Sequence, residues 1–429
     1  MKNAKKVLLV TEYYPPVIYG GGEIGAQMLA RGLSLQGMQV TVLTSAAPGK
    51  NNEASEKNEN GIRVLRLLET GNPRTMLGNI KRRLVFGASA KKHIKKIDGQ
   101  EHFEVIHFLN NTSIVGLGEA NKKTVATINS YNALCPKANL FYKEKTVCTG
   151  CSPGKYVGCI TCSSSVGRVL LPWFLRYNPL FWFWNYRSYV KQREHLRNVG
   201  KKIVFSEYAA GILKRYGMNG QILPNFTIPL PLHAHTKKEK EIKKTEKQKE
   251  QPLTIGYIGS LEKMKGVAAL LKAYAILKAK KQDVRMVFVG SGRYEIVLQA
   301  LARHDENIIF KGPLSPEDTQ KVYAEIDAVA IPSLWPEPFS RVLLEAYYHG
   351  KPVIATAVGG NADYVVDGVT GYLVSPDHAA EELAAAITTL KNRKQLAVLG
   401  RNARSYYDAN LAPEKTLLKI CDVYEKTLD

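Results

Sequence analysis

Short apolar runs alternate along this chain with segments in which apolar residues recur at every third or fourth position. Residues 6–10 form a continuous apolar run, and three glycines follow at 20–22. Apolar positions between 24 and 33 then fall on one face of a helix, which Gly37 ends before the next apolar run at 40–43. Strand, glycine loop, helix and strand in this order predict an α/β fold.

The same alternation continues through most of the chain. Further short strands are predicted at 62–67, 105–109, 124–128, 202–206, 254–258, 285–289 and 308–311. A chain of 429 residues is too long for one compact core, so we expect two domains. Residues 231–252 are charged and almost without apolar side chains, which is typical of a solvated loop, and we place the domain boundary there.

The stretch 331–360 carries the most informative chemistry. A short strand and a proline-rich turn lead into a helix that begins near Phe339, and Gly350 ends that helix. Glu337 therefore lies in the turn before the helix, and Glu345 lies within it. A helix N-terminus presents free N–H groups that suit a phosphate, and carboxylates beside it accept hydrogen bonds from hydroxyls. The pattern indicates a site for a sugar attached to a nucleoside diphosphate.

Seven residues separate Glu337 from Glu345, within the sequence PEPFSRVLLEAYYHGKPVIATAVGG. This stretch resembles the Glu-x7-Glu signature of retaining family-4 glycosyltransferases. The start of the chain is similar to the same family, with a Pro-Pro pair, a Gly-Gly-x-Glu loop and a helix before Val-Thr-Val-Leu. The matching motifs cover about residues 6–44 and 202–376. The resemblance implies the GT-B architecture, in which two Rossmann-like domains face each other across a central cleft.

Under this resemblance, residues 1–230 form an acceptor-binding domain that carries a cysteine-rich and aromatic insertion at 131–195. Residues 253–412 form a nucleotide-sugar-binding domain, and residues 413–429 form a helix that returns to the first domain. The implied activity is transfer of a sugar from a UDP-, GDP- or ADP-sugar to a lipid-linked or oligosaccharide acceptor. Such a reaction belongs to the biosynthesis of cell-envelope glycans or polysaccharides.

The resemblance also implies roles for single residues. Glu337 would contact the donor sugar, and Glu345 would bind the ribose hydroxyls. Lys265, with the backbone amides near Phe339 and Ser340, would stabilise the charge that builds on the leaving diphosphate. The other donor-binding positions lie in glycine-rich or strand-end loops: Gly21, Gly22, Ser260, Gly290, Gly292 and Gly312. This chemistry requires no metal or other cofactor.

Two residues depart from the family pattern. Asn129 stands where relatives carry a histidine that contacts the donor sugar; we keep it as a catalytic-site candidate, although an amide can neither donate nor accept a proton as an acid or base. Ser260 stands where relatives carry an arginine that grips the diphosphate. These departures leave an alternative open, a weak or inactive GT-B protein that binds a glycan, a lipid or another transferase. A sugar-nucleotide epimerase is a further alternative.

Five cysteines lie close together in the sequence of the insertion. Cys148 and Cys151 form one Cys-x2-Cys pair, Cys159 and Cys162 form another, and Cys135 lies upstream. The N-terminus lacks an apolar stretch long enough for a signal peptide, so we expect a reducing compartment and metal binding rather than disulfides. Two such pairs predict one closed, structural zinc site, with an iron–sulfur cluster and disulfides or free thiols as alternatives.

Residues 169–190 combine tryptophan, phenylalanine and tyrosine with arginine, which is the composition of segments at a membrane interface. The alternative is an aromatic stripe packed inside the domain or at a dimer contact. The formal charge of +22 and the basic runs at 81–83 and 91–92 favour an anionic membrane surface as a partner. We found no motif of a nucleic-acid-binding fold, so nucleic acid is not an expected partner. The predicted location is cytoplasmic, peripheral on the inner face of the cell membrane.

Overall fold

The computed structural model describes residues 5–46, 55–59, 61–73, 75–110, 112–117, 121–163, 165–166, 169–170, 172–225 and 252–428. Apart from its last residue, the charged segment predicted at 231–252 lies outside these described residues. The chain divides into two compact units. Unit 1 comprises Met1–Phe226, Trp335–Phe339 and Pro413–Asp429, and unit 2 comprises Thr227–Leu334 and Ser340–Ala412.

Unit 1 is built on an eight-stranded sheet in the order β12-β11-β6-β5-β1-β2-β4-β3. The strands are β1 (Lys6–Val10), β2 (Gln39–Ser45), β3 (Ser55–Glu59), β4 (Ile62–Leu68), β5 (Val105–Phe108), β6 (Asn121–Ile128), β11 (Val199–Val204) and β12 (Gln221–Ile222). All neighbours are parallel except β3, which runs antiparallel to β4. The central strands are buried on both faces, which is why their sequences are continuous apolar runs rather than alternating ones.

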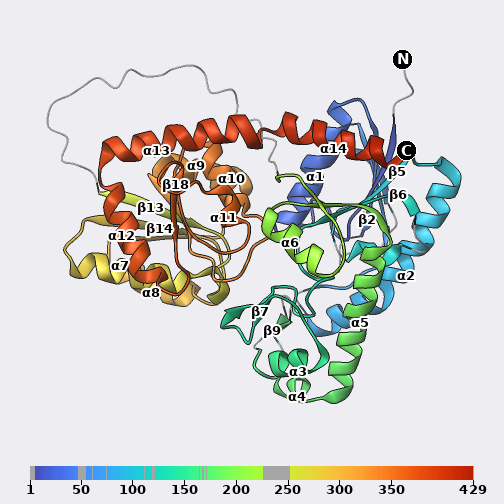
Figure 1. Ribbon diagram of the computed structural model, residues 1–429, viewed down its shortest axis with the longest axis horizontal. Helices are drawn as coiled ribbons and strands as arrows, with labels where there is room; N and C mark the ends of the chain where they lie inside the picture. The colour runs from blue at the N-terminus through green and yellow to red at the C-terminus, as the bar shows by residue number, and fades with distance from the viewer. Residues whose placement is uncertain are drawn as a thin grey trace. The chain divides into compact units, whose positions relative to one another are not determined.

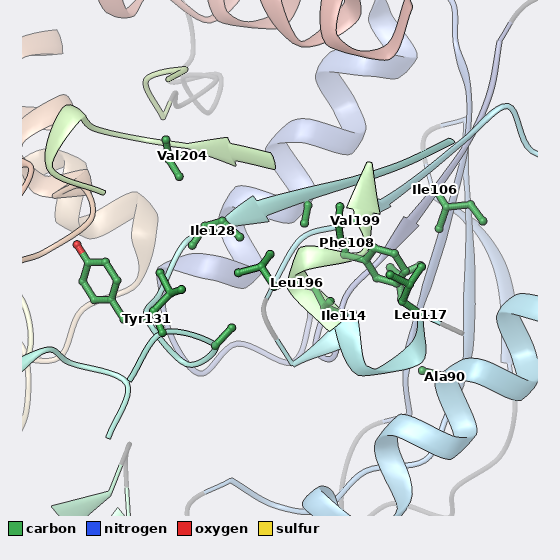
Figure 2. Packing of buried hydrophobic residues seen from close by; sticks show 14 of the residues in the cluster. Ala90, Ile106, Phe108, Ile114, Leu117, Ile128, Tyr131, Leu196, Val199 and Val204 are labelled. Atoms are coloured by element: carbon green, nitrogen blue, oxygen red, sulfur yellow. The ribbon is translucent and has the colours of Figure 1, made fainter. Parts of the chain in front are cut away.

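Helices cover this sheet (Figure 1). They are α1 (Gly21–Leu35), α2 (Met76–Glu101), α5 (Pro179–Arg197), α6 (Glu207–Arg215) and α14 (Pro413–Leu428), with the short 3-10 helix η1 (Ser113–Gly116). Figure 2 shows one region of the core, a buried cluster that includes Ile106 and Phe108 of β5, Ile128 of β6 and Leu196 of α5. Burial of such side chains is the main driving force for this packing.

A separate layer of small elements lies between β6 and β11 in the chain. It contains the hairpin of β7 (Phe141–Tyr142) and β8 (Thr146–Val147), the helix α3 (Pro153–Thr161), the strands β9 (Ser165–Val166) and β10 (Val169–Leu170), and the helix α4 (Trp173–Arg176). Tyr156 and Ile160 of α3 form a second buried cluster, against which Phe181, Trp182 and Tyr186 of α5 pack. This cluster attaches the layer to α5.

Unit 2 contains a six-stranded parallel sheet in the order β15-β14-β13-β16-β17-β18. Its strands are β13 (Leu253–Ile258), β14 (Val284–Val289), β15 (Ile308–Gly312), β16 (Ala328–Ile331), β17 (Val353–Thr356) and β18 (Gly371–Val374). Its helices are α7 (Val267–Ala279), α8 (Glu295–His304), α9 (Pro316–Glu325), α10 (Arg341–Tyr348), α11 (Asn361–Tyr364), α12 (Ala379–Leu390) and α13 (Arg393–Tyr406). The strand order reverses between β13 and β16, and ligands bind at such switch points in open α/β sheets.

The strand expected at 202–206 differs from the structure. It begins at Val199, which pairs with β6, and it ends at Val204. Ser206 instead caps α6, because its side chain accepts a hydrogen bond from the Ala209 N–H. The polar residues at the start of this strand gave no apolar signal, so its extent depends on long-range pairing. Among the described residues, no helix combines the length and apolar character that crossing a bilayer requires.

Candidate functional site

The loops at the carboxyl edge of the sheet in unit 2 are joined by backbone hydrogen bonds. The Leu261 N–H donates to the Ser291 carbonyl at 2.9 Å, which joins the loops after β13 and β14. The Gly290 N–H donates to the Gly312 carbonyl at 2.9 Å, which joins the loop after β14 to the end of β15. These bonds bring four predicted donor-binding positions to one edge of the sheet: Ser260, Gly290, Gly292 and Gly312.

The turn that carries Lys265 is locked in place by the glycine after it. Lys265 ends the 3-10 helix η2 (Lys263–Lys265), and Gly266 follows with a φ of 75°. A Cβ atom on Gly266 would lie 1.7 Å from the Pro332 carbonyl oxygen, so only glycine fits there. The Leu334 N–H also donates to the Met264 carbonyl at 2.8 Å. The turn of Lys265 is therefore fixed against the segment that follows β16, at the switch point of the sheet.

The carboxylate of Glu345 is held by two neighbours within unit 2. The Tyr323 hydroxyl donates to Oε2 at 2.9 Å, and Nη2 of Arg341 donates to Oε1 at 3.1 Å. The Tyr323 ring stacks on His349 with centroids 4.7 Å apart. Burial, with the negative charge of Glu345, raises the pKa of Tyr323 well above its usual value, so this phenol stays a donor. Glu345 thus has a fixed orientation and lone pairs left for further donors.

Glu337 is buried in Trp335–Phe339, a short segment of unit 1 that lies in the chain between two parts of unit 2. Trp335 packs edge-on to Tyr131 with centroids 6.4 Å apart, and Phe339 packs against Phe205 at 6.2 Å. Glu337 lies between these two aromatic anchors and is 7% exposed. Ser340, also buried, begins the approach to α10. As expected, Glu337 precedes that helix and Glu345 lies within it, although the helix begins at Arg341 rather than near Phe339.

The glycine loop at the start of α1 lies beside Asn129. A Cβ atom on Gly22 would lie 3.5 Å from Nδ2 of Asn129, and Gly21 is the first residue of the helix. Nδ2 of Asn129 donates to the Leu109 carbonyl at 2.8 Å, which fixes the amide at the ends of β5 and β6. Three predicted residues of unit 1 therefore lie together at the carboxyl edge of its sheet.

Sequence reasoning missed a buried charge two residues after the end of β1. The Glu12 carboxylate is 1% exposed and is paired with the Arg82 guanidinium, whose Nη2 lies 2.7 Å from Oε2. The hydroxyls of Thr70 and Thr112 donate to the same carboxylate at 2.8 and 2.9 Å. A glutamate at the end of a fully buried strand was the signal available in the sequence. This network joins the segment after β1 with α2 and two loops, at the edge where Gly22 and Asn129 lie.

Sequence reasoning also missed Arg293, the residue after Gly292. Its Nε lies 3.3 Å from Oε2 of Glu262, in the loop that follows β13. Arg293 thus adds a guanidinium to the strand-end loops of unit 2.

The predicted set of four metal ligands is not gathered in the structure. Cys148, Cys151 and Cys159 line one cavity together with Cys135, whereas Cys162 is exposed and does not line it. Burial, with the nearby thiols of the other three, raises the pKa of Cys151 to about 12. The cysteines are free thiols, and the described residues include no group of three or more His, Cys, Asp or Glu side chains arranged to hold a metal ion.

The aromatic segment divides between two environments. Phe181, Trp182 and Tyr186 pack on α3, as described above. A second set is exposed on α4, on α5 and between them: Trp173 (74%), Phe174 (50%), Tyr177 (63%), Leu180 (79%) and Phe183 (65%). Leu77, Ile80 and Leu84 of α2 are also exposed, at helical spacing. The alternative of an aromatic stripe packed inside the domain therefore holds for only part of the segment.

Comparisons with known proteins show what this chain is similar to in sequence and in fold. The lipopolysaccharide 1,2-N-acetylglucosaminetransferase of Salmonella typhimurium is 28% identical over 159 residues, 35% of this chain and 42% of that protein. This chain matches less than half the length of the first curated relatives. Sucrose-phosphate synthase of Thermosynechococcus elongatus has a TM-score of 0.69 at 19% identity, over 98% of both chains. HepE of Anabaena, solved in complex with UDP, has a TM-score of 0.60 at 17% identity, over 98% of this chain and 100% of its own.

These structural similarities show the fold, an α/β arrangement of parallel-sheet, Rossmann-like domains that matches GT-B proteins. Residues 238–406 match the family described as Glycosyl transferases group 1. That range includes Lys265, Glu337, Glu345 and the strand-end loops of unit 2. This part of the chain is therefore a glycosyl transferases group 1 domain.

Proposed function

We propose that this protein is a retaining glycosyltransferase that moves a sugar from a nucleotide-diphosphate-sugar to a lipid-linked or oligosaccharide acceptor. The observation that carries the proposal is the joined set of loops at the switch point of the sheet in unit 2. There the Lys265 turn is locked against the segment after β16. A cation at the ends of parallel strands, beside glycine loops with accessible backbone, suits a diphosphate. The match to group 1 glycosyltransferases supports the same reading.

Each residue has a proposed role at the donor. Glu345 accepts hydrogen bonds from the ribose hydroxyls, and its fixed orientation supports this role. Glu337 contacts the donor sugar. Lys265 and the backbone amides near Phe339 and Ser340 stabilise the negative charge on the leaving diphosphate, because charge stabilisation by groups already in position is usually the largest catalytic effect.

Arg293 compensates for the arginine that Ser260 replaces. Its loop is bonded to the loop of Ser260, and its salt bridge to Glu262 keeps the guanidinium beside that loop. A guanidinium binds phosphate oxygens in a bidentate manner, which a serine hydroxyl cannot do. We therefore assign to Arg293 a second positive charge for the diphosphate.

The donor is tested first by ligand-induced thermal stabilisation with UDP, GDP, ADP and their common sugar conjugates. A ligand at 100 times its dissociation constant stabilises the protein by about 2.7 kcal/mol. We expect a shift for one base, lost in Lys265→Ala and kept in the matched control Lys272→Ala, an exposed lysine on α7. The absence of any shift across the panel would contradict the donor site.

The exposed aromatic face of α4 and α5 supports a membrane-bound acceptor. Arg83 connects α2 to α5, because its guanidinium lies 5.6 Å from the ring centroid of Trp184 and donates a hydrogen bond to the Asn185 side chain. Large aromatic side chains with arginine between them suit the interface of an anionic membrane. We propose that the protein lies on the cytoplasmic leaflet through this face, beside a lipid-linked acceptor.

Flotation with anionic liposomes at low salt tests the membrane proposal. We expect the protein to float with the vesicles and Trp173→Ser/Phe183→Ser to stay at the bottom. Ile296→Ser, at a 78% exposed position on α8 in unit 2, is the control that keeps the unchanged behaviour. Equal flotation of both variants would rule out this face as the contact.

The alternative is a catalytically weak partner of another transferase. One observation favours it: the Asn129 amide is bonded to the Leu109 carbonyl and offers no acid or base at the donor sugar. Glu337→Gln separates the two functions. If the protein is an enzyme, this variant loses sugar transfer while keeping the nucleotide shift, whereas a binding partner shows no transfer in either form.

A further inference from the structure

A small cavity lies beneath the loop that follows β6. Its lining includes four thiols, those of Cys135, Cys148, Cys151 and Cys159. Its volume is about 20 Å³, which is room for a single water-sized sphere. No histidine or carboxylate is among the described residues that line it. The cavity therefore offers room for one ion and a ligand set made only of sulfur.

The four thiols come from separate parts of the insertion. Cys135 lies in the loop after β6, Cys148 directly follows β8, Cys151 precedes α3, and Cys159 lies within α3. Three of the four are therefore on irregular backbone, which adjusts to a ligand more easily than a helix does. Cys162 follows the last turn of α3 and is exposed. The fold, rather than the Cys-x2-Cys spacing, selects which thiols share the cavity.

Two lysines also line the cavity, and both ammonium groups are already held in place. Nζ of Lys137 donates to the Phe141 carbonyl at 3.3 Å, and Nζ of Lys155 lies 5.4 Å from the centroid of the Tyr142 ring. A divalent ion with four thiolates carries a net charge of about −2. Two cations at the wall stabilise such a complex in a buried place.

We propose that Cys135, Cys148, Cys151 and Cys159 bind one Zn²⁺ ion, and that Cys162 is not a ligand. Sulfur ligands in a tetrahedral set select zinc among the common divalent ions. On binding, the four thiols release four protons to solvent and four Zn–S bonds form, with no change of oxidation state. The described residues include no group already arranged to hold a metal ion, so binding of zinc requires the four sulfurs to move closer together.

The site would stabilise structure rather than take part in chemistry, because four thiolates leave no open coordination position. Tyr156 of α3 accepts a hydrogen bond from Asn185 of α5 at 2.7 Å, so an ion bound at Cys159 ties α5 to the loop of Cys135. That same loop begins at Asn129. This inference does not depend on the transferase activity.

Metal content of the purified full chain tests the ligand set. We expect about one zinc per chain in the unchanged protein and in Cys162→Ser, and a loss of at least tenfold in Cys135→Ser. Zinc lost from Cys162→Ser but kept by Cys135→Ser would overturn the assignment in favour of the two Cys-x2-Cys pairs. Iron with visible absorbance, or no metal in the unchanged protein, would overturn the zinc site itself.

A second measurement needs no variant and therefore does not depend on the folding of Cys135→Ser. Thiols are alkylated with iodoacetamide with and without a zinc chelator, and each cysteine is located by mass spectrometry. We expect alkylation of Cys151 and Cys159 to require the chelator, because a metal-bound thiolate is protected, whereas Cys162 reacts in both conditions. If Cys162 also requires the chelator, or if the chelator changes nothing, the proposed ligand set is wrong.

Discussion

Replacing Gly266 with alanine tests how the turn of Lys265 is held. The new Cβ would lie 1.7 Å from the Pro332 carbonyl oxygen and 2.5 Å from its carbonyl carbon. Both are backbone atoms, so the overlap can be relieved only if one loop moves away from the other. The φ of 75° at this position adds a second cost, because L-residues with a Cβ avoid that region.

The two costs can be separated with a matched control. Gly368 has a φ of 69°, and no heavy atom lies within 4 Å of a Cβ built there. Gly368→Ala therefore carries only the backbone cost of about 1 kcal/mol, part of which is offset by the lower entropy of the unfolded chain. Gly266→Ala carries the same cost plus an overlap of about 1–3 kcal/mol. We expect it to be less stable than Gly368→Ala by that overlap.

The assay is urea unfolding of both variants, followed by nucleotide binding in the absence of urea. A displaced turn moves Lys265, so we expect Gly266→Ala to lose the thermal shift from its best nucleotide while Gly368→Ala keeps it. Equal unfolding midpoints for the two variants would refute the close approach of Gly266 to Pro332. A normal nucleotide shift in a destabilised Gly266→Ala would refute the role of that approach in placing Lys265.

Three further predictions concern buried polar groups. Burial lowers the pKa of His107 from 6.5 to about 3, so the stability that the neutral imidazole contributes is complete above about pH 6.5 and is lost as pH falls toward 3. In urea unfolding we expect the free energy of unfolding to fall by about 2 kcal/mol between pH 7 and 5, and we expect no such loss in His107→Gln. Arg82→Met leaves the Glu12 carboxylate buried without its ion-pair partner, and we expect it to destabilise the protein by about 3–5 kcal/mol. The double variant Arg82→Met/Glu12→Gln should recover part of this stability, and a destabilisation by Arg82→Met of less than about 1 kcal/mol would contradict this account. Tyr323→Phe removes one hydrogen bond to the Glu345 carboxylate, and we expect nucleotide affinity measured by calorimetry to fall about tenfold while the fold is unchanged. Unchanged affinity would show that this bond does not position the carboxylate.

Local sequence patterns determined much of the fold and part of the site. The apolar runs at residues 6–10 and 40–43 predicted the buried strands β1 and β2, because parallel strands covered on both faces need apolar residues throughout. The break at Gly350 and the apolar spacing before it predicted α10 with Glu345 inside it. These features depend on interactions within a few residues, which a sequence pattern records directly.

The tertiary structure decided which distant groups meet. Sequence spacing favoured Cys162 as a partner of the other thiols, but the fold brings Cys135 to the cavity instead. The pair of Glu12 and Arg82 joins residues 70 positions apart. The packing of α3 determines which aromatic side chains of α5 are buried and which stay exposed. Each of these outcomes depends on which surfaces pack together, and packing is set by shape and burial across the whole unit rather than by the periodicity of any one segment.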